Sequence, residues 1–527
     1  MNSSKLFFNN INKRIFFLDL PFLFYLNKMT KIFFTRKLDG SNKKIKCIKC
    51  NRRSRINSSH ICYYCYGMNS LISNSGNINI DNFIKGTHSP NNKNDDPYLS
   101  WVPFEEFKDI KKIGQGGFSQ IFKATWKFSE GINDKGKEKR SKSKREIVLK
   151  ILNKSQNVDT EFLNELKHTF QFRSDLSGYE RGIIKCYGVT QDPKTKNYAF
   201  VLEYIPNGDL HHFIHKNFEE FIWKSKIHYL NSIVAGIKNI HDKKIIHRDL
   251  HSGNILAKKN INDIVLYYNI RTVISDLGFS QPANIDSNLS RESQIYGIIP
   301  YMAPELFKNQ PYSYASDIYS LGMIMWQLTS GHRPFHDQEH GPKLILDILD
   351  GKRPEITEDT SECWANLMKR CWHPNPSQRP TIQEIGGLLR EFQTYRSKYE
   401  LEFNEAEKKR LEMVESKKPF VKNPGYEHPD SRYYSTSLNS MLESINSTVT
   451  DLFSNNHLLS NDHFDIMNFN SDQKNDFENS DHNSSVENSK KHFLNELLLQ
   501  ENIEDQNDFK RRKIVEYFNE CFVDFSL

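Results

Sequence analysis

The chain has 527 residues, of which 37% are hydrophobic and 26% are charged, and its formal net charge is +7. This length exceeds one compact core, whereas the hydrophobic content suffices for one large folded domain with the remaining residues in polar segments. A net charge this small does not by itself indicate a nucleic-acid or lipid partner, so no specific nucleic-acid partner is predicted.

The chain contains eight cysteines, and half of them lie within nineteen residues that begin at Cys47 and end at Cys65. The others are scattered singly, which differs from the spacing of an extracellular disulfide framework. We therefore expect the chain in a reducing compartment, with the cytoplasm preferred and the nucleus as the alternative.

Residues 1–42 form an aromatic and basic extension of uncertain role. Lys13, Arg14 and Asp19 interrupt its apolar run, and no small-residue cleavage site follows, so the pattern does not match a signal peptide. The run is also too short and too broken for a membrane span. Two interpretations stay open: translation starts at Met29, which we prefer, or the extension anchors at a membrane interface.

Residues 43–67 form a small Cys-rich, basic unit in which Cys47-x-x-Cys50 and Cys62-x-x-Cys65 are separated by eleven residues. Each pair can present two thiolates from one turn, and two such turns close a tetrahedral site, so the four cysteines predict a structural Zn²⁺. A histidine in place of one thiolate and incidental cysteines are the alternatives. The surrounding basic residues favour a solvated or protein-docking surface over a nucleic-acid site, because no base-stacking array is evident.

Residues 68–106 are rich in Asn, Ser, Gly and Asp and indicate a linker. Over residues 107–393, strand-like runs such as Glu146–Leu152 precede longer apolar-periodic segments such as Ile222–Ile240. This order predicts an α+β domain with a small β-rich lobe ahead of a larger helical lobe. Residues 394–527 are predicted to be a mostly disordered tail with helical segments, because their Asn- and Ser-rich stretches carry little apolar surface to bury.

Six motifs follow one another within this domain. A glycine-rich segment between two strand-like runs would let backbone amides approach phosphate oxygens. Lys150 lies in a strand pattern that would bury a lone ammonium, and Glu165, on a predicted helix, can offer the opposite charge. In chain order, the motifs are Ile113–Ile121, Lys150, Glu165, His247–Leu256, Asp276-Leu277-Gly278 and Ala303-Pro304-Glu305.

Together and in this order, these motifs closely resemble the signature set of eukaryotic protein kinases. The resemblance covers about Phe107 to Phe392, and within the superfamily the sequence is most similar to the tyrosine-kinase-like group. It implies a two-lobed fold, binding of ATP and Mg²⁺, and transfer of the γ-phosphoryl group to protein substrates in signalling.

The resemblance assigns a role to each residue of the predicted catalytic set. Lys150 would hold the α- and β-phosphates and pair with Glu165. Asn254 and Asp276 would bind the two Mg²⁺ ions, and Asp249 would orient the acceptor hydroxyl and take its proton. Because phosphoryl transfer needs little covalent help from the protein, positioning and charge neutralisation would constitute the mechanism.

The resemblance also implies a nucleotide site with a gatekeeper at Leu202 and hinge contacts from Glu203 and Ile205. The residues of this site are Ile113, Gly114, Gln115, Gly116, Gly117, Phe118, Ser119, Ile121, Val148, Lys150, Leu202, Glu203, Ile205 and Leu256. Matches with a structural role outside catalysis are Asp317, Glu305 and Arg379.

Two departures from the family pattern bear on the acceptor. His251 stands where serine/threonine kinases usually carry lysine, and Ile298 stands where they usually carry threonine. A protonated His251 could donate to the γ-phosphate, although more weakly than lysine. The group resemblance nevertheless predicts transfer to serine and threonine, with some transfer to tyrosine because Ile298 leaves a flat apolar wall. Milder departures are Ser119, Val148 and Leu277.

A pseudokinase scaffold or an adaptor, binding partners through the kinase fold, is the alternative function. Its usual mark is the loss of a residue such as Lys150, Asp249 or Asp276, and this chain retains all three. Arg248 further implies control by a phosphate on a hydroxyl within residues 279–296. The sequence does not specify the substrate, the pathway, the activator or the oligomeric state.

Overall fold

The protein is described here from a computed structural model. The described residues are 46–48, 61–62, 74–87, 99–129, 142–156, 160–172, 182–259, 270–282, 295–394 and 397–445. They belong to two units: a small one with residues 1–70 and 132–138, and a large one with residues 71–131 and 139–527. The predicted aromatic extension over residues 1–42 and the predicted tail beyond residue 445 lie outside the described residues.

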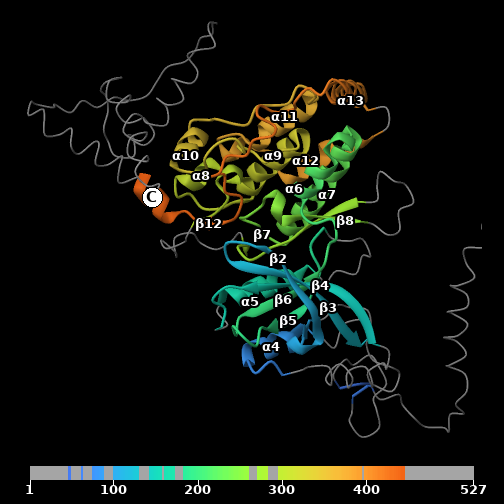
Figure 1. The fold of residues 1–527 in the computed structure, drawn as a ribbon, viewed down its shortest axis with the longest axis vertical. Coiled ribbons are helices and arrows are strands. Elements are labelled where there is room, and N and C mark those ends of the chain that lie inside the picture. The colour runs from blue at the N-terminus through green and yellow to red at the C-terminus, as the bar shows by residue number, and fades with distance from the viewer. Residues whose placement is uncertain are drawn as a thin grey trace, which may run out of the picture. The chain divides into compact units, whose positions relative to one another are not determined.

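The first lobe of the large unit is a six-stranded sheet with the order β1-β5-β6-β4-β3-β2 (Figure 1). Neighbouring strands are antiparallel except for β1 and β5, which are parallel. Helix α5 (Thr160–Gln171) packs on the sheet, and the Phe162 ring stacks on that of Phe200 with centroids 5.1 Å apart. The strands are β1 (Ser100–Trp101), β2 (Phe107–Gln115), β3 (Ser119–Ser129), β4 (Lys142–Leu152), β5 (Cys186–Gln191) and β6 (Tyr198–Glu203).

Helix α4 (Ile78–Thr87) extends this lobe at its N-terminal side. Asn77 caps the helix, because its side-chain oxygen accepts hydrogen bonds from two backbone N–H groups of the first turn at 3.0 and 3.3 Å. Ile80 and Ile84 lie on one face at helical spacing and are buried in the lobe's core. The predicted linker over residues 68–106 is thereby corrected, since α4 and β1 belong to the folded lobe.

The second lobe is helical, and α9 (Tyr314–Ser330) lies at its centre with every residue from Ser316 onward buried. A capping box between Ser313 and Ser316 begins this helix, and Gly331 ends it in the left-handed conformation with φ +77°. The other helices are α6 (Leu210–Asn217), α7 (Trp223–Asp242), α8 (Pro304–Phe307), α10 (Pro342–Leu349), α11 (Glu362–Cys371) and α12 (Ile382–Gln393).

Short strands and 3₁₀ turns lie in the loops that connect the longer elements. The strand pairs are β7 (Ile245–Ile246) with β10 (Gln281–Pro282), and β8 (Ile255–Lys259) with β9 (Ile270–Ile274). The 3₁₀ turns are η1 (Phe104–Glu106), η2 (Phe218–Glu220), η3 (Ser252–Asn254), η5 (Ile299–Tyr301) and η6 (Pro376–Gln378).

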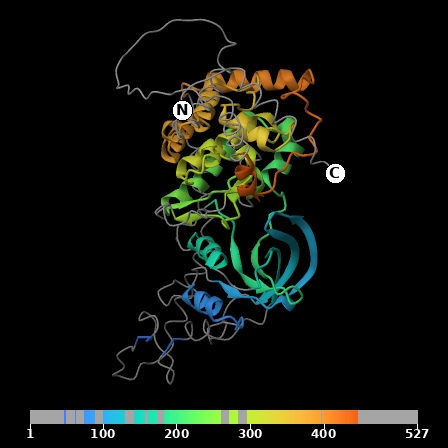
Figure 2. The ribbon, with the colours of Figure 1, turned by 90° about the vertical axis from the view of Figure 1, so that its left-hand side faces the viewer.

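Residues 397–445 continue beyond the helical lobe and pack against it (Figure 2). Helix α13 (Glu400–Glu415) places the Phe403 ring 5.7 Å from that of Trp223, both measured between centroids. Farther along, β12 (Thr436–Ser437) pairs antiparallel with β11 (Tyr296–Gly297). The prediction of a mostly disordered tail from residue 394 is corrected for this segment, because it buries apolar side chains in the lobe's core.

The small unit is described at five residues. Cys47 and Cys62 are both buried, and the backbone N–H of Cys62 donates to Cys47 Sγ at 3.2 Å. Cys50 and Cys65, the other two predicted zinc ligands, lie outside the described residues. Across the described parts of both units, no helix combines the length and the apolar character needed to cross a lipid bilayer.

Candidate active site

The glycine-rich turn between β2 and β3 forms one wall of the site. The Gly116 N–H donates to the Ser119 carbonyl at 2.8 Å, which closes the turn. At its tip, the Phe118 ring lies 5.0 Å from that of Phe279 and 5.1 Å from that of Tyr296, measured between centroids. The turn is therefore held by aromatic contacts to the segment that follows the Asp276 triplet.

Lys150 reaches its partners from β4, with its stem buried in the sheet. Its Nζ lies 2.8 Å from Glu165 Oε1 on α5 and 2.7 Å from Asp276 Oδ1. Burial acts to lower the pKa of Lys150, but the attraction of Asp276 and Glu165 outweighs it and raises this pKa above its ordinary value. The predicted Lys150–Glu165 pair is thus formed, and the ammonium stays charged.

Asp276 is held in the left-handed region with φ +58°, which is uncommon for a residue with a side chain. The N–H of Gly278 donates to its Oδ1 at 3.3 Å. A Cβ at Gly278 would come within 3.0 Å of Glu165 Oε2 and 3.1 Å of Asp276 Oδ1, so glycine leaves room for both carboxylates. Leu277, which lies between Asp276 and Gly278 in the sequence, is an apolar side chain buried in the core of the helical lobe.

Asp249 lies in the loop after β7, beside Asn254. The Asn254 amide nitrogen donates to the Asp249 carbonyl at 2.9 Å, which directs the amide oxygen of Asn254 away from that carbonyl. Asp317 braces this loop from α9, since its two oxygens accept from the backbone N–H groups of His247 at 2.9 Å and Arg248 at 3.0 Å. Asp317 therefore holds the backbone that carries the proton acceptor.

His251 occupies the place of the family's lysine and faces Asp249. The Gly253 N–H donates to His251 Nδ1 at 3.1 Å, which makes Nδ1 an acceptor and leaves Nε2 as the nitrogen that faces the carboxylate. That nitrogen lies 3.7 Å from Asp249 Oδ2. The His251 ring is thus directed at Asp249, and the predicted donation from a protonated His251 to the γ-phosphate stays a prediction.

The environment of Asp249 favours its carboxylate. Burial alone would raise its pKa, but His251, the hydroxyl of Ser435 and then His247 outweigh burial and lower the pKa of Asp249 below its ordinary value. A carboxylate kept ionised can accept a proton from a hydroxyl. Asp249 therefore has the charge that its predicted role requires.

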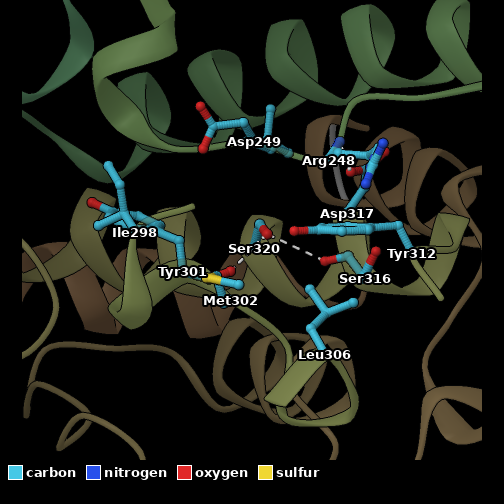
Figure 3. A pocket seen from close by; sticks show the side chains of 11 residues that line it. Arg248, Asp249, Ile298, Tyr301, Met302, Leu306, Tyr312, Ser316, Asp317 and Ser320 are labelled. Carbon is cyan, nitrogen blue, oxygen red and sulfur yellow. Dashed lines mark hydrogen bonds between the residues drawn. The ribbon is translucent and has the colours of Figure 1, made fainter. Parts of the chain in front are cut away.

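A small pocket lies directly below the catalytic loop (Figure 3). Asp249 and Arg248 border it on one side, and Ile298 and Tyr301 border it on the other. Ile298 is only 2% exposed and contributes an apolar wall. Ser320 also lines the pocket, and its hydroxyl donates to the Tyr301 carbonyl at 2.7 Å.

Arg248 and Ser280, which bear on the predicted control by a phosphate within residues 279–296, have different surroundings. The Arg248 guanidinium lies 4.1 Å from the Tyr312 ring centroid, and its Nε donates to no partner among the described residues. Ser280 is buried, and its hydroxyl donates to the Leu277 carbonyl at 2.6 Å. Residues 283–294 lie outside the described residues, so a phosphate there paired with Arg248 stays a prediction.

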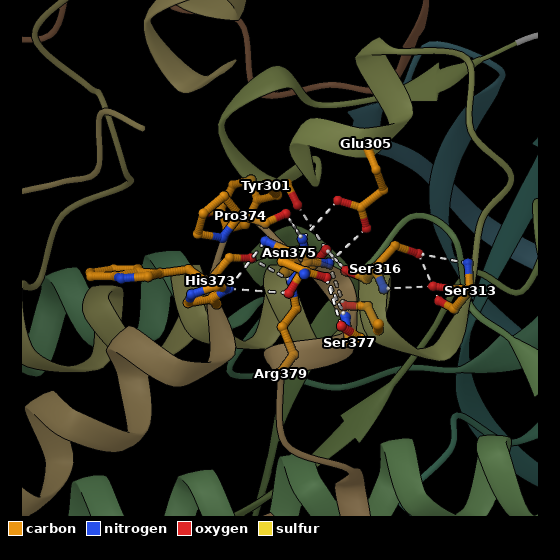
Figure 4. Close-up of polar contacts among 12 residues, drawn as sticks. Tyr301, Glu305, Ser313, Ser316, His373, Pro374, Asn375, Ser377 and Arg379 are labelled. Atoms are coloured by element: carbon orange, nitrogen blue, oxygen red, sulfur yellow. Dashed lines mark hydrogen bonds and ion pairs between the residues drawn. The ribbon is translucent and has the colours of Figure 1, made fainter. Parts of the chain in front are cut away.

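Glu305 and Arg379 form the predicted pair beneath the acceptor platform (Figure 4). Both guanidinium NH groups donate to the two carboxylate oxygens at 2.7 Å, a bidentate geometry. Arg379 also donates to the backbone carbonyls of Ala315, His373 and Pro374 at 2.9, 2.8 and 3.2 Å. Every direction of this buried cation is satisfied, which makes the pair structural.

The predicted adenine-binding residues come together where the two lobes meet. Leu202 and Leu256 pack against a buried cluster that contains Ile205. Val148 on β4 is the register partner of Leu202 on β6. Glu203, at the predicted hinge, is tied to Lys258 at 3.1 Å. This arrangement leaves apolar side chains from both lobes to hold a flat base, with the glycine-rich turn adjacent.

The family comparison agrees with this geometry. A model of the protein tyrosine and serine/threonine kinase family matches residues 107–389, a little over half of the chain. The chain belongs to this protein kinase family. The predicted eukaryotic kinase superfamily and the two-lobed α+β fold are thereby confirmed.

Individual relatives match the same region of the chain. A probable serine/threonine-protein kinase of Dictyostelium discoideum is 26% identical over 297 residues, covering 55% of this chain and 20% of the relative. The dual specificity protein kinase splA of the same organism is 28% identical, covering 55% and 12%. The serine/threonine-protein kinase STY17 of Arabidopsis thaliana is 24% identical, covering 55% and 45%. This kinase chain thus spans less than half the length of each of these relatives.

Sequence reasoning missed one residue at the site. Ser435 donates its hydroxyl hydrogen bond to Asp249 Oδ2 at 2.6 Å, although the two residues are 186 positions apart. The segment lies in a stretch predicted to be polar and disordered. Its available signal was the spacing of Leu438, Leu442 and Ile445, which repeats every three to four residues as on one helix face.

Proposed function

We propose that this chain is an active ATP-dependent kinase that transfers the γ-phosphoryl group to protein hydroxyls. The observation that carries the proposal is the assembled charge set: Lys150 contacts both Glu165 and Asp276, and Asp249 lies beside Asn254 as a carboxylate. A pseudokinase scaffold is the weaker alternative, because it would not need all of these groups in register.

The donor set fits Mg²⁺ and ATP. Asp276 offers the Mg²⁺-preferred carboxylate, and Lys150 engages only its Oδ1. Asn254 donates through its nitrogen, which leaves its amide oxygen for a cation. When bound, Mg²⁺–ATP supplies the phosphoryl group and neutralises its negative charge. Lys150 would hold the phosphates, and Asp249 would orient the acceptor and take its proton.

We infer that serine and threonine are the main acceptors, with some transfer to tyrosine, and that the chain falls in the tyrosine-kinase-like group. The names of the relatives, serine/threonine and dual specificity kinases, support this acceptor range. The apolar wall at Ile298 supports it as well, since an apolar side chain does not hydrogen-bond to the acceptor and so does not select one hydroxyl over another. Phosphoamino-acid analysis of the products tests the inference.

We also propose that Cys47, Cys50, Cys62 and Cys65 hold a structural Zn²⁺. The N–H bond to Cys47 Sγ supports a thiolate there, because backbone amides commonly stabilise metal-bound sulfur. No group of three or more ligand residues gathers among the described residues, and two of the four cysteines fall outside them. Elemental analysis of the full chain should find one Zn²⁺ that Cys47→Ser removes; a metal-replete chain without zinc would contradict the site.

The kinase proposal is tested on the full chain with labelled ATP, Mg²⁺ and a generic serine-rich protein. Asp249→Asn removes the proton acceptor and should lower transfer roughly 10²–10⁴-fold. Ser440→Ala, a change at an exposed tail position, is the matched control and should leave transfer intact. Both variants should unfold at the wild-type temperature. Undiminished transfer by Asp249→Asn would refute the assigned role.

A further inference from the structure

The tail returns to the acceptor side of the active site as a short added strand. Figures 1 and 2 both place β12 and the turns after it where the helical lobe faces the sheet. In the β11–β12 pair, Tyr296 lies opposite Ser437 and Gly297 lies opposite Thr436. The pair continues through the Leu438 N–H, which donates to the Ile295 carbonyl at 2.8 Å. An extended segment that adds a strand is a common way for peptides to be recognised.

Ser435, immediately before this strand, lies between the proton acceptor and the glycine-rich turn. Its hydroxyl donates to Asp249 Oδ2 at 2.6 Å, and the residue is 8% exposed. Its carbonyl oxygen lies so close to Gly117 that a Cβ there would come within 2.1 Å of it. The hydroxyl therefore occupies the position from which an acceptor gives its proton to Asp249.

Contacts on the N-terminal side of Ser435 hold the segment to the helical lobe. The Tyr433 hydroxyl donates to the Pro334 carbonyl at 2.9 Å, and the Arg333 guanidinium lies 3.8 Å from the centroid of the Tyr433 ring. The N–H of Arg432 donates to His340 Nδ1 at 3.0 Å. These contacts fix the segment in register before it enters the site.

Contacts on the C-terminal side fix the other end. The Ile295 N–H donates to Asn439 Oδ1 at 2.7 Å. Leu438, Leu442 and Ile445 are 2%, 5% and 8% exposed, respectively, and join the core cluster of the helical lobe. Ser435 is thus anchored from both directions, as a bound substrate residue would be.

We propose that Ser435 is an intramolecular phosphate acceptor of this kinase and that the segment around it, residues 427–445, blocks other substrates until it is phosphorylated. The proposal rests on the proposed kinase function. The Ser435 proton passes to Asp249, its oxygen forms a bond to the γ-phosphorus of ATP, and the bond from that phosphorus to the β,γ-bridging oxygen breaks. ADP leaves with that electron pair, so atoms and charge balance and no oxidant is needed.

The neighbouring hydroxyl residues are less well placed. Ser437 and Ser440 are exposed, and Thr436 is half-buried beside β11. Among the described tail residues, Ser435 is the one that hydrogen-bonds to Asp249. The geometry therefore selects one acceptor within a stretch that offers several.

Phosphorylation also supplies a way to release the tail. A phosphoserine carries roughly −1.5 to −2 charge at neutral pH and would lie beside the Asp249 carboxylate. Like charges at this separation repel, so the modified segment leaves the site. Before that step, the docked tail competes with other substrates as part of the same molecule, so it need not diffuse to the site.

The test uses the full chain, first treated with phosphatase and then given Mg²⁺–ATP. Mass spectrometry should find phosphate on Ser435, at a first-order rate that does not change over a hundredfold dilution of the protein. Ser435→Ala should remove this phosphopeptide, and Ser440→Ala should keep it. A mass-tagged Asp249→Asn chain added to active chain should remain unmodified at Ser435.

Release of the tail is tested separately with two variants. Leu438→Glu removes a buried anchor and should raise transfer to a generic protein substrate roughly 10- to 100-fold before any autophosphorylation. Asn439→Ala removes one hydrogen bond and should raise it roughly 2- to 10-fold. If Leu438→Glu fails to fold, Asn439→Ala carries the test.

The outcomes separate the inference from the kinase proposal. Phosphate on a generic substrate without phosphate on Ser435 overturns the inference and leaves the kinase function standing. A Ser435 rate that rises with protein concentration, or phosphate on the tagged chain, overturns the intramolecular step. No Asp249-dependent transfer to any substrate, even with Leu438→Glu and Asn439→Ala, overturns the kinase function and the inference with it.

Discussion

Helix α13 should contribute to the stability of the helical lobe, and Phe403→Ala tests this. The Phe403 side chain is 7% exposed, and its ring lies 5.7 Å from that of Trp223 and 5.1 Å from that of Phe392, measured between centroids. Removing a buried phenylalanine typically costs about 3–5 kcal/mol of unfolding free energy, because burial is lost and a cavity remains. For a domain of this size, that loss lowers the melting temperature by roughly 5–15 °C.

The matched control is Leu401→Ala, two positions away on the same helix but 75% exposed. It should change the unfolding free energy by no more than about 0.5 kcal/mol. Thermal unfolding of the two full-length variants is followed by tryptophan fluorescence, to which Trp223, the neighbour of Phe403, contributes. If both variants melt at the same temperature, α13 is not docked on the lobe, and the corrected domain boundary is wrong.

Two further predictions concern titratable side chains of the helical lobe. Glu305→Ala leaves the buried Arg379 guanidinium without its carboxylate and should lower the unfolding free energy by about 3–5 kcal/mol, measured by thermal or denaturant unfolding. The control Glu391→Ala breaks an exposed pair with Lys398 and should lower it by less than about 1 kcal/mol. Equal losses in the two variants would contradict a structural role for the Glu305–Arg379 pair. Burial, and then the nearby Arg333 and histidines, lower the pKa of His211 from 6.5 to about 3. Between these two pH values, the unfolded chain binds a proton at His211 and the folded chain does not. Stability should therefore fall as pH drops below 6.5. Denaturant titrations at pH 7.5 and 5.5 should show a smaller fall in the unfolding free energy for His211→Gln than for the wild type. An equal fall in both proteins would argue against a neutral, half-buried His211.

The catalytic set could be predicted from the sequence because its chemistry is local to short motifs. Lys150, Glu165, Asp249 and Asp276 each stand in a recognisable pattern, and the structure brings all four into one site. The strand and helix order also follows from periodicity, which reports burial along each element. These features depend on residues close together in the chain.

The remainder depends on contacts that motifs do not record. Helix α4 is only ten residues long, so its two buried isoleucines were masked by the Asn-, Ser- and Gly-rich composition of the residues around it. The orientation of the His251 ring is set by a hydrogen bond from the backbone N–H of Gly253, which no side-chain pattern reveals. The Ser435–Asp249 bond joins positions 186 residues apart, and only the folded tail brings them together.

The aromatic cluster at the tip of the glycine-rich turn has a mechanical consequence. Phe118 belongs to the roof of the nucleotide site, whereas Phe279 and Tyr296 belong to the segment that borders the acceptor. Movement of the glycine-rich turn away from the helical lobe separates these rings and exposes apolar surface to water, which costs roughly 25 cal/mol for each Å² uncovered. Opening of the glycine-rich turn for nucleotide exchange is thereby coupled to the segment that borders the acceptor. A substitution such as Phe118→Ala would weaken the packing of the turn and of that segment together.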